Sequence, residues 1–344
     1  MPTRPAWSRG STITGVPAFD MSSSSGPTSV QSGDVSEAVP VGGLSEAKRR
    51  LVAEYLACPS CRAVLYPGTR DVVCAGCGTE YPLVDDVLVL LPSGRDEVAD
   101  RLRARYEVTT GGTSLPAVFR ITRRMLGDVR GRAVLDVGCS QGQFAFEHLL
   151  PSGARAVIGI DFSAAAVREA QRRAVSIDNA LFVVGDAMSL PLQSDKFEKV
   201  VITEVIEHLP DVAACLSELR RALAPGGDVV LSTPNYFNPV GVFKLIFDRV
   251  HHGGRERWTY ADHSEELEHF QTPFTVRRQL AAAGLTVADF RGSDLWMALR
   301  KALLVPWLVF DHGLRRALNL LQRDLLSRTF LKYFGVVQYY RLRK

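Results

Sequence analysis

Four acidic residues in the middle of the chain each follow a short apolar run, and they are the residues best placed to do chemistry. The first, Asp136, precedes three small residues at alternate positions, Gly138, Ser140 and Gly142. A turn of small residues lets a ligand approach the backbone, and the N-terminus of a following helix offers free N–H groups. This arrangement is typical of a nucleotide site, although an ordinary tight turn between a strand and a helix has the same composition.

The other three acidic residues limit which ligand such a site could bind. Asp161 follows the turn by about 20 residues, a spacing that suits ribose hydroxyls. Asp186 can accept from an adenine amino group, and Glu204 ends a fourth apolar run. Asp136 would repel a pyrophosphate but suits a cation, and the turn lacks the Gly-x-Gly-x-x-Gly pattern of dinucleotide sites. The set therefore predicts a ligand with adenine, ribose and a positively charged amino-acid end, which fits S-adenosylmethionine.

Alternating strands and helices must position these side chains. Seven apolar runs predict strands, and helix-forming stretches lie between most of them. This alternation predicts an α/β fold with a doubly wound, seven-stranded, Rossmann-like sheet, in which ligands bind beyond the carboxyl ends of the strands. The predicted strands are 133–135, 155–160, 180–184, 199–203, 228–232, 285–290 and 336–342, and the predicted helices are 118–129, 143–150, 163–176, 211–224 and 272–283. The predicted N-caps of the last three helices are Ser163, Asp211 and Thr272.

Several motifs resemble those of class I S-adenosylmethionine-dependent methyltransferases: Leu135-Asp-Val-Gly-Cys-Ser-Gln-Gly, Gly159-Ile-Asp161, Gly185-Asp186-Ala187 and Pro225-Gly-Gly227. The resemblance implies that the turn holds the amino-acid end of the cofactor, that Asp161 holds the ribose and that Glu204 borders the methyl-transfer cleft. Many members of this class carry Gly at the position of Ser140. The implied cofactor-binding residues are Asp136, Gly138, Ser140, Gly142, Asp161, Phe162, Asp186, Ala187 and Glu204.

The stretch Thr203-Glu-Val-Ile-Glu-His-Leu209 is similar to the small-molecule branch that includes the quinone-biosynthesis O-methyltransferases. This similarity implies His208 as a general base with Glu204 beside it, and His269 as a second catalytic candidate. Some relatives bind a divalent metal at this cluster, so a divalent metal at the acceptor site is a further expectation. The alternative is that Glu207 and His208 only open the loop before the next helix.

Two Cys-x-x-Cys pairs, twelve residues apart, lie nearer the N-terminus. Four thiolates at this spacing are ligands for tetrahedral zinc, and they leave no open coordination position, so the predicted zinc is structural. A redox dithiol would need a thioredoxin-like βαβ context, which the surrounding sequence lacks. Tyr81 to Pro92 follows as the predicted last strand of this segment. With its Tyr-Pro-x-x-Asp-x-Val-x-x-Leu-Leu, the segment resembles the zinc-ribbon activator of tRNA and ribosomal methylation enzymes. The predicted ligands are Cys58, Cys61, Cys74 and Cys77.

Composition divides the chain into four parts. Residues 1–45, rich in Ser, Gly, Pro and Thr, predict a disordered leader, and residues 46–92 form the predicted zinc ribbon. A linker and an amphipathic helix occupy 93–131, and the methyltransferase domain occupies 132–344. The ribbon is expected to be separable, so that zinc removal would unfold it and spare cofactor binding. Because there is no secretion signal and no apolar run of about 20 residues, the sequence predicts a cytoplasmic protein.

A helical insert is predicted at 295–334, with seven basic and two acidic side chains. It fits two roles. One is a basic amphipathic surface that contacts the inner face of a membrane or a lipid-linked substrate. The other is a helical lid or dimer surface over the acceptor pocket.

The leading hypothesis is a small-molecule methyltransferase acting on an oxygen of a quinone or polyketide ring, a sugar or a lipid-linked glycan. A nucleic-acid partner is disfavoured, because residues 48–91 carry five basic and five acidic side chains and the net charge of the chain is only +4. An RNA methyltransferase is the alternative, since similar ribbons precede ribosomal methylation enzymes and the insert is basic. A non-catalytic cofactor-binding scaffold is the third reading, and the oligomeric state is left open.

Overall fold

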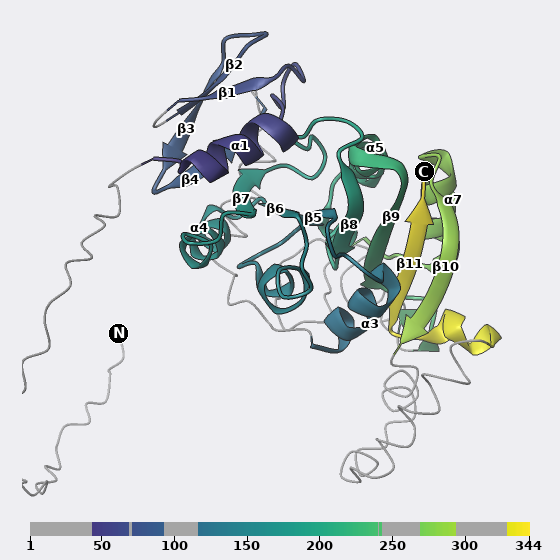
Figure 1. Cartoon of the computed structure of the whole chain (residues 1–344). Helices are drawn as coiled ribbons and strands as arrows, with labels where there is room; N and C mark the ends of the chain where they lie inside the picture. Colours follow the sequence, from purple (N-terminus) through teal and green to yellow (C-terminus); the bar gives the residue numbers. More distant parts are fainter. Residues whose placement is uncertain (1–42, 69–70, 93–115, 240, 243–268, 294–328) are drawn as a thin grey trace, which may run out of the picture. The chain divides into compact units, whose positions relative to one another are not determined.

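Eleven strands join into one mixed sheet in the computed structural model, which describes residues 43–68, 71–92, 116–239, 241–242, 269–293 and 329–344 (Figure 1). The strands are β1 (Leu65–Pro67), β2 (Asp71–Cys74), β3 (Glu80–Val84), β4 (Val87–Leu90), β5 (Ala133–Val137), β6 (Ala156–Asp161), β7 (Ala180–Gly185), β8 (Phe197–Thr203), β9 (Leu223–Pro234), β10 (Thr286–Ser293) and β11 (Val337–Arg343). Their order across the sheet is β1-β2-β3-β4-β7-β6-β5-β8-β9-β11-β10. The predicted α/β class is confirmed; the predicted count of seven strands is not, because four strands of the cysteine-bearing segment extend the sheet to eleven among the described residues.

The last seven strands in this order, which are β5 to β11 in the sequence, are those that the sequence predicted. β5 pairs in parallel with β6 and β8, β6 with β7, and β8 with β9, while β11 is antiparallel to both of its neighbours. In this register Asp136 lies beside Gly159 of β6 and Val201 of β8. Parallel strands end at the same edge of a sheet, so the four acidic residues of the predicted site share one edge.

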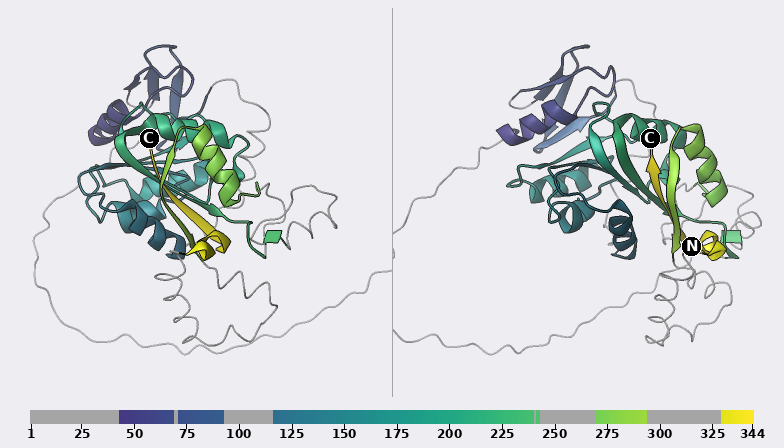
Figure 2. Two further views of the ribbon diagram at one scale, coloured as in Figure 1. Left: turned by 90° about the vertical axis from the view of Figure 1, so that its right-hand side faces the viewer. Right: turned by 45° about the vertical axis from the view of Figure 1, so that its right-hand side comes forward.

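Helices cover both faces of the sheet (Figure 2). One hydrophobic cluster contains α1 (Glu46–Tyr55), α5 (Val212–Ala222) and α7 (Pro273–Ala282), and the other contains α3 (Pro116–Leu126), the π-helical turn η1 (Ala145–Leu149) and α4 (Ala164–Arg173). The short 3-10 turns η2 (Ile206–His208) and η5 (Phe330–Phe334) complete the described helices. Ser163, Asp211 and Thr272 are the helix caps that the sequence predicted, since each side chain accepts a backbone N–H three residues further on.

The cysteine-bearing segment joins the strands of residues 132–344 through its last strand. The sequence predicted one strand from Tyr81 to Pro92, but Asp85 and Asp86 take left-handed φ values of 49° and 61° and divide it into the hairpin β3–β4. β4 then pairs in parallel with β7. This pairing covers an edge of β7 whose N–H and C=O groups would otherwise lack strand partners. The apolar run Val87–Leu90 therefore belongs to the same sheet as β5–β11, which accounts for the larger strand count.

Lys48 of α1 makes a second connection, between the cysteine-bearing segment and the loop that joins α4 to β7. The residue is 3% exposed, and its Nζ donates to the carbonyl oxygens of Ala174 at 3.1 Å, Ile177 at 2.7 Å and Ala180. These carbonyls follow the C-terminus of α4, where a cation is favourable. Burial lowers the pKa of Lys48 to about 8.

We expect Lys48→Met to lower the free energy of unfolding by about 1–3 kcal/mol, because buried carbonyls would lose a charged donor. Urea denaturation followed by circular dichroism measures this change. Arg50→Met is the matched control on the same helix: Arg50 is exposed and pairs with Glu46 one turn away, so its loss should cost less than about 0.5 kcal/mol. Equal effects of the two substitutions would contradict the stabilising role of the hydrogen bonds that Lys48 makes.

Some sequence predictions lie outside the described residues. These are the leader up to residue 42, the linker at 93–115 and most of the insert, 294–328. Among the helices that the structure does describe, none has the length and apolar character required to cross a bilayer.

Candidate cofactor site and cysteine cluster

The turn after β5 takes left-handed backbone angles at three positions. The φ values are 71° at Gly138, 48° at Ser140 and 73° at Gly142. Glycine adopts this region freely, whereas serine there costs roughly 1 kcal/mol or more. The Ser140 N–H donates to Oδ2 of Asp161 at 2.7 Å, and this bond to a carboxylate helps to hold the strained residue. The turn and the second predicted carboxylate are thus a single hydrogen-bonded unit.

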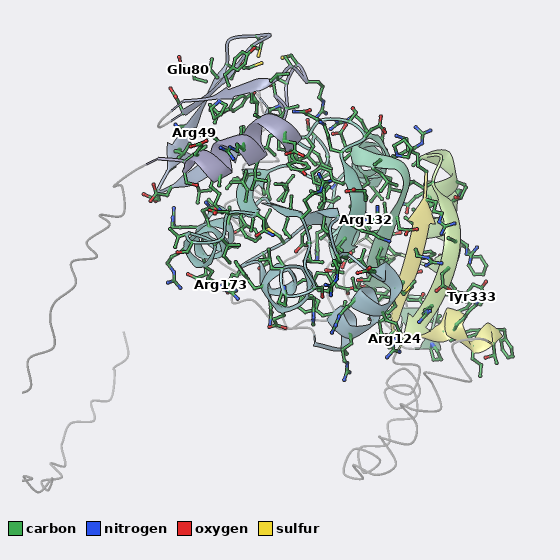
Figure 3. The ribbon with its side chains drawn as sticks, viewed as in Figure 1. Arg49, Glu80, Arg124, Arg132, Arg173 and Tyr333 are labelled. Atoms are coloured by element: carbon green, nitrogen blue, oxygen red, sulfur yellow. The ribbon has the colours of Figure 1, made fainter. Side chains whose placement is uncertain are left out.

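The helix after this turn begins as predicted but contains a π-turn instead of a continuous α-helix over 143–150. Leu150 N donates to the carbonyl of Ala145, five residues back, at 3.0 Å. Arg173 of α4, labelled in Figure 3, donates to Gln141 O at 2.9 Å and lies 4.1 Å from the centre of the Phe146 ring. Sequence reasoning missed Arg173, because its contacts are distant in the chain and no motif marks them. π-Turns are frequent at functional sites.

Asp136 is a buried carboxyl group, only 2% exposed. Within the part of the chain that the structure describes, its Oδ2 atom has no hydrogen-bond partner. Burial, and secondly the negative charge of Asp161, raise the pKa of Asp136 to about 7. A buried carboxylate without a partner is costly unless a ligand brings a positive charge. The atom therefore fits the ammonium group of an amino-acid ligand.

The residues predicted to hold the nucleoside end two neighbouring strands. Asp161, the last residue of β6, also accepts from Ser163 N at 2.9 Å. Burial raises the pKa of Asp161, while backbone N–H donors lower it. Asp186, after β7, folds its own loop, since its Oδ1 accepts from Met188 N at 2.8 Å. The remaining members of this set, Phe162 and Ala187, are partly exposed beside them. The parallel pairing of β6 and β7 brings the set together.

Glu204 lies directly after β8 with a left-handed φ of 54°. Its Oε1 accepts from Ser232 Oγ at 2.7 Å, and its N–H donates to Ser232 O at 3.0 Å. Strain in a non-glycine residue concentrates at functional sites, while the place of Glu204 beside a methyl-transfer cleft stays a prediction. Sequence reasoning missed Ser232, although a polar residue at the end of an apolar strand was a usable signal.

The two candidate histidines gather around Glu207, which is 1% exposed and accepts from Thr233 Oγ1 at 2.9 Å. His269 N donates to Glu207 O at 2.7 Å, and His208 Nε2 lies 3.9 Å from Glu207 Oε1. Burial, and then the charge of His269, lowers the pKa of His208 to about 4. His208 is therefore neutral at pH 7 and can accept a hydrogen bond, but it is a weak base.

The four predicted metal-binding cysteines form a cluster in which all sulfur atoms lie within 4.8 Å of one another. Cys58 Sγ and Cys77 Sγ are 3.7 Å apart, and Cys61 Sγ and Cys74 Sγ are 3.3 Å apart. A tetrahedral zinc with Zn–S bonds of about 2.3 Å requires a sulfur separation of about 3.8 Å. No other group of His, Cys, Asp and Glu among the described residues is arranged to hold a metal ion, so the divalent metal expected beside His208 has no support from such a grouping.

Backbone N–H groups complete the cluster. Those of Gly76 and Cys77 donate to Cys74 Sγ at 3.3 and 3.4 Å, and that of Cys61 donates to Cys58 Sγ at 3.4 Å. Gly76 is required by space, since an added Cβ would lie 2.7 Å from Ala63 Cβ. Donors aimed at sulfur stabilise thiolates, which are the metal-binding form of cysteine.

The mixed sheet, with its parallel strands and with helices on both faces, defines the class of protein: a Rossmann-like α/β protein. Residues 114–289, about half of the chain, match the family described as a methyltransferase domain. The chain belongs to this family, the S-adenosylmethionine-dependent methyltransferases.

Two curated relatives and one solved structure illustrate the similarity. A demethylmenaquinone methyltransferase of Lactococcus lactis is 34% identical over 137 residues, 38% of this chain and 54% of the relative. An S-adenosylmethionine-dependent methyltransferase of Mycolicibacterium smegmatis is 38% identical over 115 residues, 33% of this chain and 43% of the relative. The chain thus spans about half the length of the curated relatives it matches. A solved S-adenosylmethionine-dependent methyltransferase from Mesorhizobium loti is 19% identical, with a TM-score of 0.45, over 65% of this chain and 96% of that one.

Proposed function

We propose that the protein transfers the methyl group of S-adenosylmethionine to an oxygen of a small-molecule acceptor, with a quinone-type ring as the first candidate. The observation that carries the proposal is the unpartnered Oδ2 atom of buried Asp136 beside the left-handed turn. The names of the Lactococcus lactis and Staphylococcus aureus relatives, demethylmenaquinone methyltransferases, support a quinone-type ring as the acceptor molecule and do not bear on which of its atoms is methylated. Polyketide rings, sugars and lipid-linked glycans belong to the same proposal.

The cofactor is assigned along the carboxyl edge of the sheet. The turn from Asp136 to Gly142, with Gly138 and Ser140, would hold the amino-acid end, and Asp136 would pair with its ammonium group. Asp161 and Phe162 would hold the ribose. Asp186 and Ala187 would contact the adenine, and Glu204 would border the methyl group.

The chemistry needs only modest help from the protein. The sulfonium of S-adenosylmethionine is already activated, so catalysis rests on holding the acceptor atom in line with the methyl carbon at roughly 3–3.5 Å. The cluster of Glu207, His208 and His269 supports an acceptor site beyond Glu204. Because the pKa of His208 is lowered to about 4, we assign it to orient an acceptor hydroxyl by accepting its hydrogen bond. With this pKa it is too weak a base to take the proton of a phenol-type hydroxyl, whose pKa is about 10.

Methyl transfer from isotopically labelled S-adenosylmethionine, detected by mass spectrometry, tests the acceptor. We expect the label in a demethylated quinone or a hydroxylated aromatic ring and none in total RNA. Label in RNA would favour the alternative, an RNA methyltransferase, which the basic composition of 295–334 keeps open. Cofactor binding without transfer to any acceptor would favour a non-catalytic scaffold. Co-sedimentation of the full chain with anionic vesicles tests the further prediction of membrane contact through 295–334.

The cysteine cluster is proposed to hold one structural zinc ion. Four thiols within tetrahedral range, with backbone donors on the sulfurs, suit zinc. Such a site is coordinatively closed, so zinc would supply folding energy and take no part in methyl transfer.

The pKa of Asp136 makes cofactor affinity depend on pH. A carboxyl group with a pKa of about 7 is neutral below pH 7 and anionic above it, and a cationic ligand prefers the anion. We therefore expect the dissociation constant for S-adenosylmethionine to rise as pH falls below 7, by up to about tenfold per pH unit. Calorimetry between pH 5.5 and 8 measures this slope.

Asp136→Asn is the control for that experiment. It should bind S-adenosylmethionine weakly at every pH and lack the slope, because the titrating group is gone. A wild-type affinity that stays constant over this range would contradict the pairing of Asp136 with the ammonium group.

A further inference from the structure

The loop that carries the proposed adenine-binding residues is bonded to the cysteine-bearing segment at almost every residue from 189 to 193. Ala57 N donates to Pro191 O at 3.0 Å, and Leu56 forms an antiparallel bridge with Leu192. Gln193 N donates to Tyr55 O at 2.9 Å. Its Nε2 donates to the carbonyls of residues 53 and 56 at 2.8 and 3.1 Å. The ribbon therefore packs directly against this loop and holds it by hydrogen bonds.

The first Cys-x-x-Cys turn, residues 58–62, is called the cysteine knuckle here. It contacts the part of the loop that is nearest in the sequence to Asp186. Ser189 Oγ donates to the carbonyl of Pro59, which lies between the first two cysteines, at 3.2 Å. Arg62, the residue after Cys61, donates through Nη1 to Leu190 O. Arg62 has a left-handed φ of 67°, so its position depends on the knuckle remaining folded.

Arg62 and Arg221, from different elements, donate hydrogen bonds to the carbonyls of the loop, and Glu218 forms an ion pair with both. Arg221 of α5 donates to Leu192 O at 2.6 Å and to Leu190 O at 3.1 Å. Glu218 lies 3.1 Å from Arg62 Nη2 and 2.7 Å from Arg221 Nη2. A network of charge-assisted bonds on main-chain oxygens positions a loop more firmly than separate surface contacts.

The loop in turn positions the strand end. Ser189 N donates to Asp186 O at 3.0 Å. Pro191 packs on Gly185, where an added Cβ would lie 2.9 Å from Ile160 and 3.2 Å from the Pro191 ring. A displacement of residues 189–191 would therefore reach Asp186 directly.

From these contacts we infer that Arg62 is a positioning residue for the adenine end of the cofactor site, so that the folded cysteine knuckle sets cofactor affinity. Arg62 touches no cofactor atom in this scheme, and it acts through Leu190 and the turn at Asp186. The inference rests on the proposed adenine site. It replaces the expectation from sequence that the ribbon can unfold without effect on cofactor binding.

The test compares zinc-loaded wild-type protein with Arg62→Ala. We expect Arg62→Ala to raise the dissociation constant for S-adenosylmethionine about fivefold to tenfold, as for the loss of one charge-assisted hydrogen bond. Hydrogen–deuterium exchange of the amides of residues 187–193 should become faster, while the amides of β5 and β6 stay unchanged. Arg62→Lys keeps a donor for Leu190 O and should recover part of both effects.

Arg155→Ala is the matched control. Arg155 also joins the ribbon to the catalytic part, through Glu54 at 3.6 Å, and its other ion-pair partner is Glu198. Neither contact involves the loop, so this variant should keep wild-type affinity and loop exchange. If Arg62→Ala loses its metal, Ser189→Ala is the second variant, because it removes a contact with the ribbon by a change outside the ribbon. Its dissociation constant should rise roughly threefold.

Unchanged affinity and unchanged loop exchange in Arg62→Ala would overturn the inference. The same loss of affinity in Arg155→Ala would also overturn it, because the effect would then come from general loosening of the ribbon. If wild-type protein does not bind S-adenosylmethionine, the proposed function itself fails, and that outcome is visible before any variant is made.

Discussion

Asp161→Ala is expected to weaken S-adenosylmethionine binding about a hundredfold. The substitution would remove the proposed acceptor for the ribose hydroxyls. It would also release the N–H groups of Ser140 and Ser163, which Asp161 holds at 2.7 and 2.9 Å. Hydrogen bonds to charged groups contribute about 1.5–3 kcal/mol each, and every 1.4 kcal/mol is a factor of about ten in affinity. Calorimetric titration of the purified variant measures the loss.

The neighbouring substitutions separate the two roles of Asp161. Asp161→Asn keeps one carbonyl oxygen for Ser140 or the ribose, so its loss should be intermediate. Glu169→Gln changes a partly exposed carboxylate on α4 that pairs with Arg172, and it should bind like the wild type. A folded Asp161→Ala protein with wild-type affinity would refute the ribose assignment.

The sequence was sufficient for the parts of the fold that local chemistry determines. Buried apolar runs predicted the strands from β5 to β11, and Ser163, Asp211 and Thr272 were predicted as helix caps and are caps. The carboxylates could be placed at one edge because parallel strands end together. These features depend on the pattern within one segment and on a general property of α/β sheets.

What the sequence did not reveal depends on contacts between distant segments. The turn at Asp85 and Asp86 sends β4 into the catalytic sheet, yet its residues read as part of a single apolar strand. Arg62 and Arg221 come together at Leu190 O and Glu218, which are distant in the sequence from Arg62. The low pKa of His208 arises from burial, which no motif reports. Such features require three-dimensional packing, so a pattern in one stretch cannot contain them.

Cys74→Ser is expected to have the largest effect on stability of any single substitution in the ribbon. Cys74 is 2% exposed, ends β2 and receives the N–H groups of Gly76 and Cys77 on its sulfur. Structural zinc contributes about 10–16 kcal/mol of apparent binding free energy in small zinc-finger peptides. A ribbon of this size has too small a core to fold without such a staple. The variant should therefore lose its zinc, and its ribbon should unfold.

The consequence should extend beyond the ribbon, because β4 pairs with β7 and Lys48 holds the end of α4. We expect the midpoint of thermal unfolding to fall by more than about 10 °C. Metal analysis should fall from one zinc per chain to much less. Cys215→Ala is the control, since Cys215 is a buried free thiol of α5 outside the cluster. It should keep one zinc and lose only a little stability. A Cys74→Ser protein that keeps both its metal and its melting temperature would show that the cluster is not what holds the ribbon on the sheet.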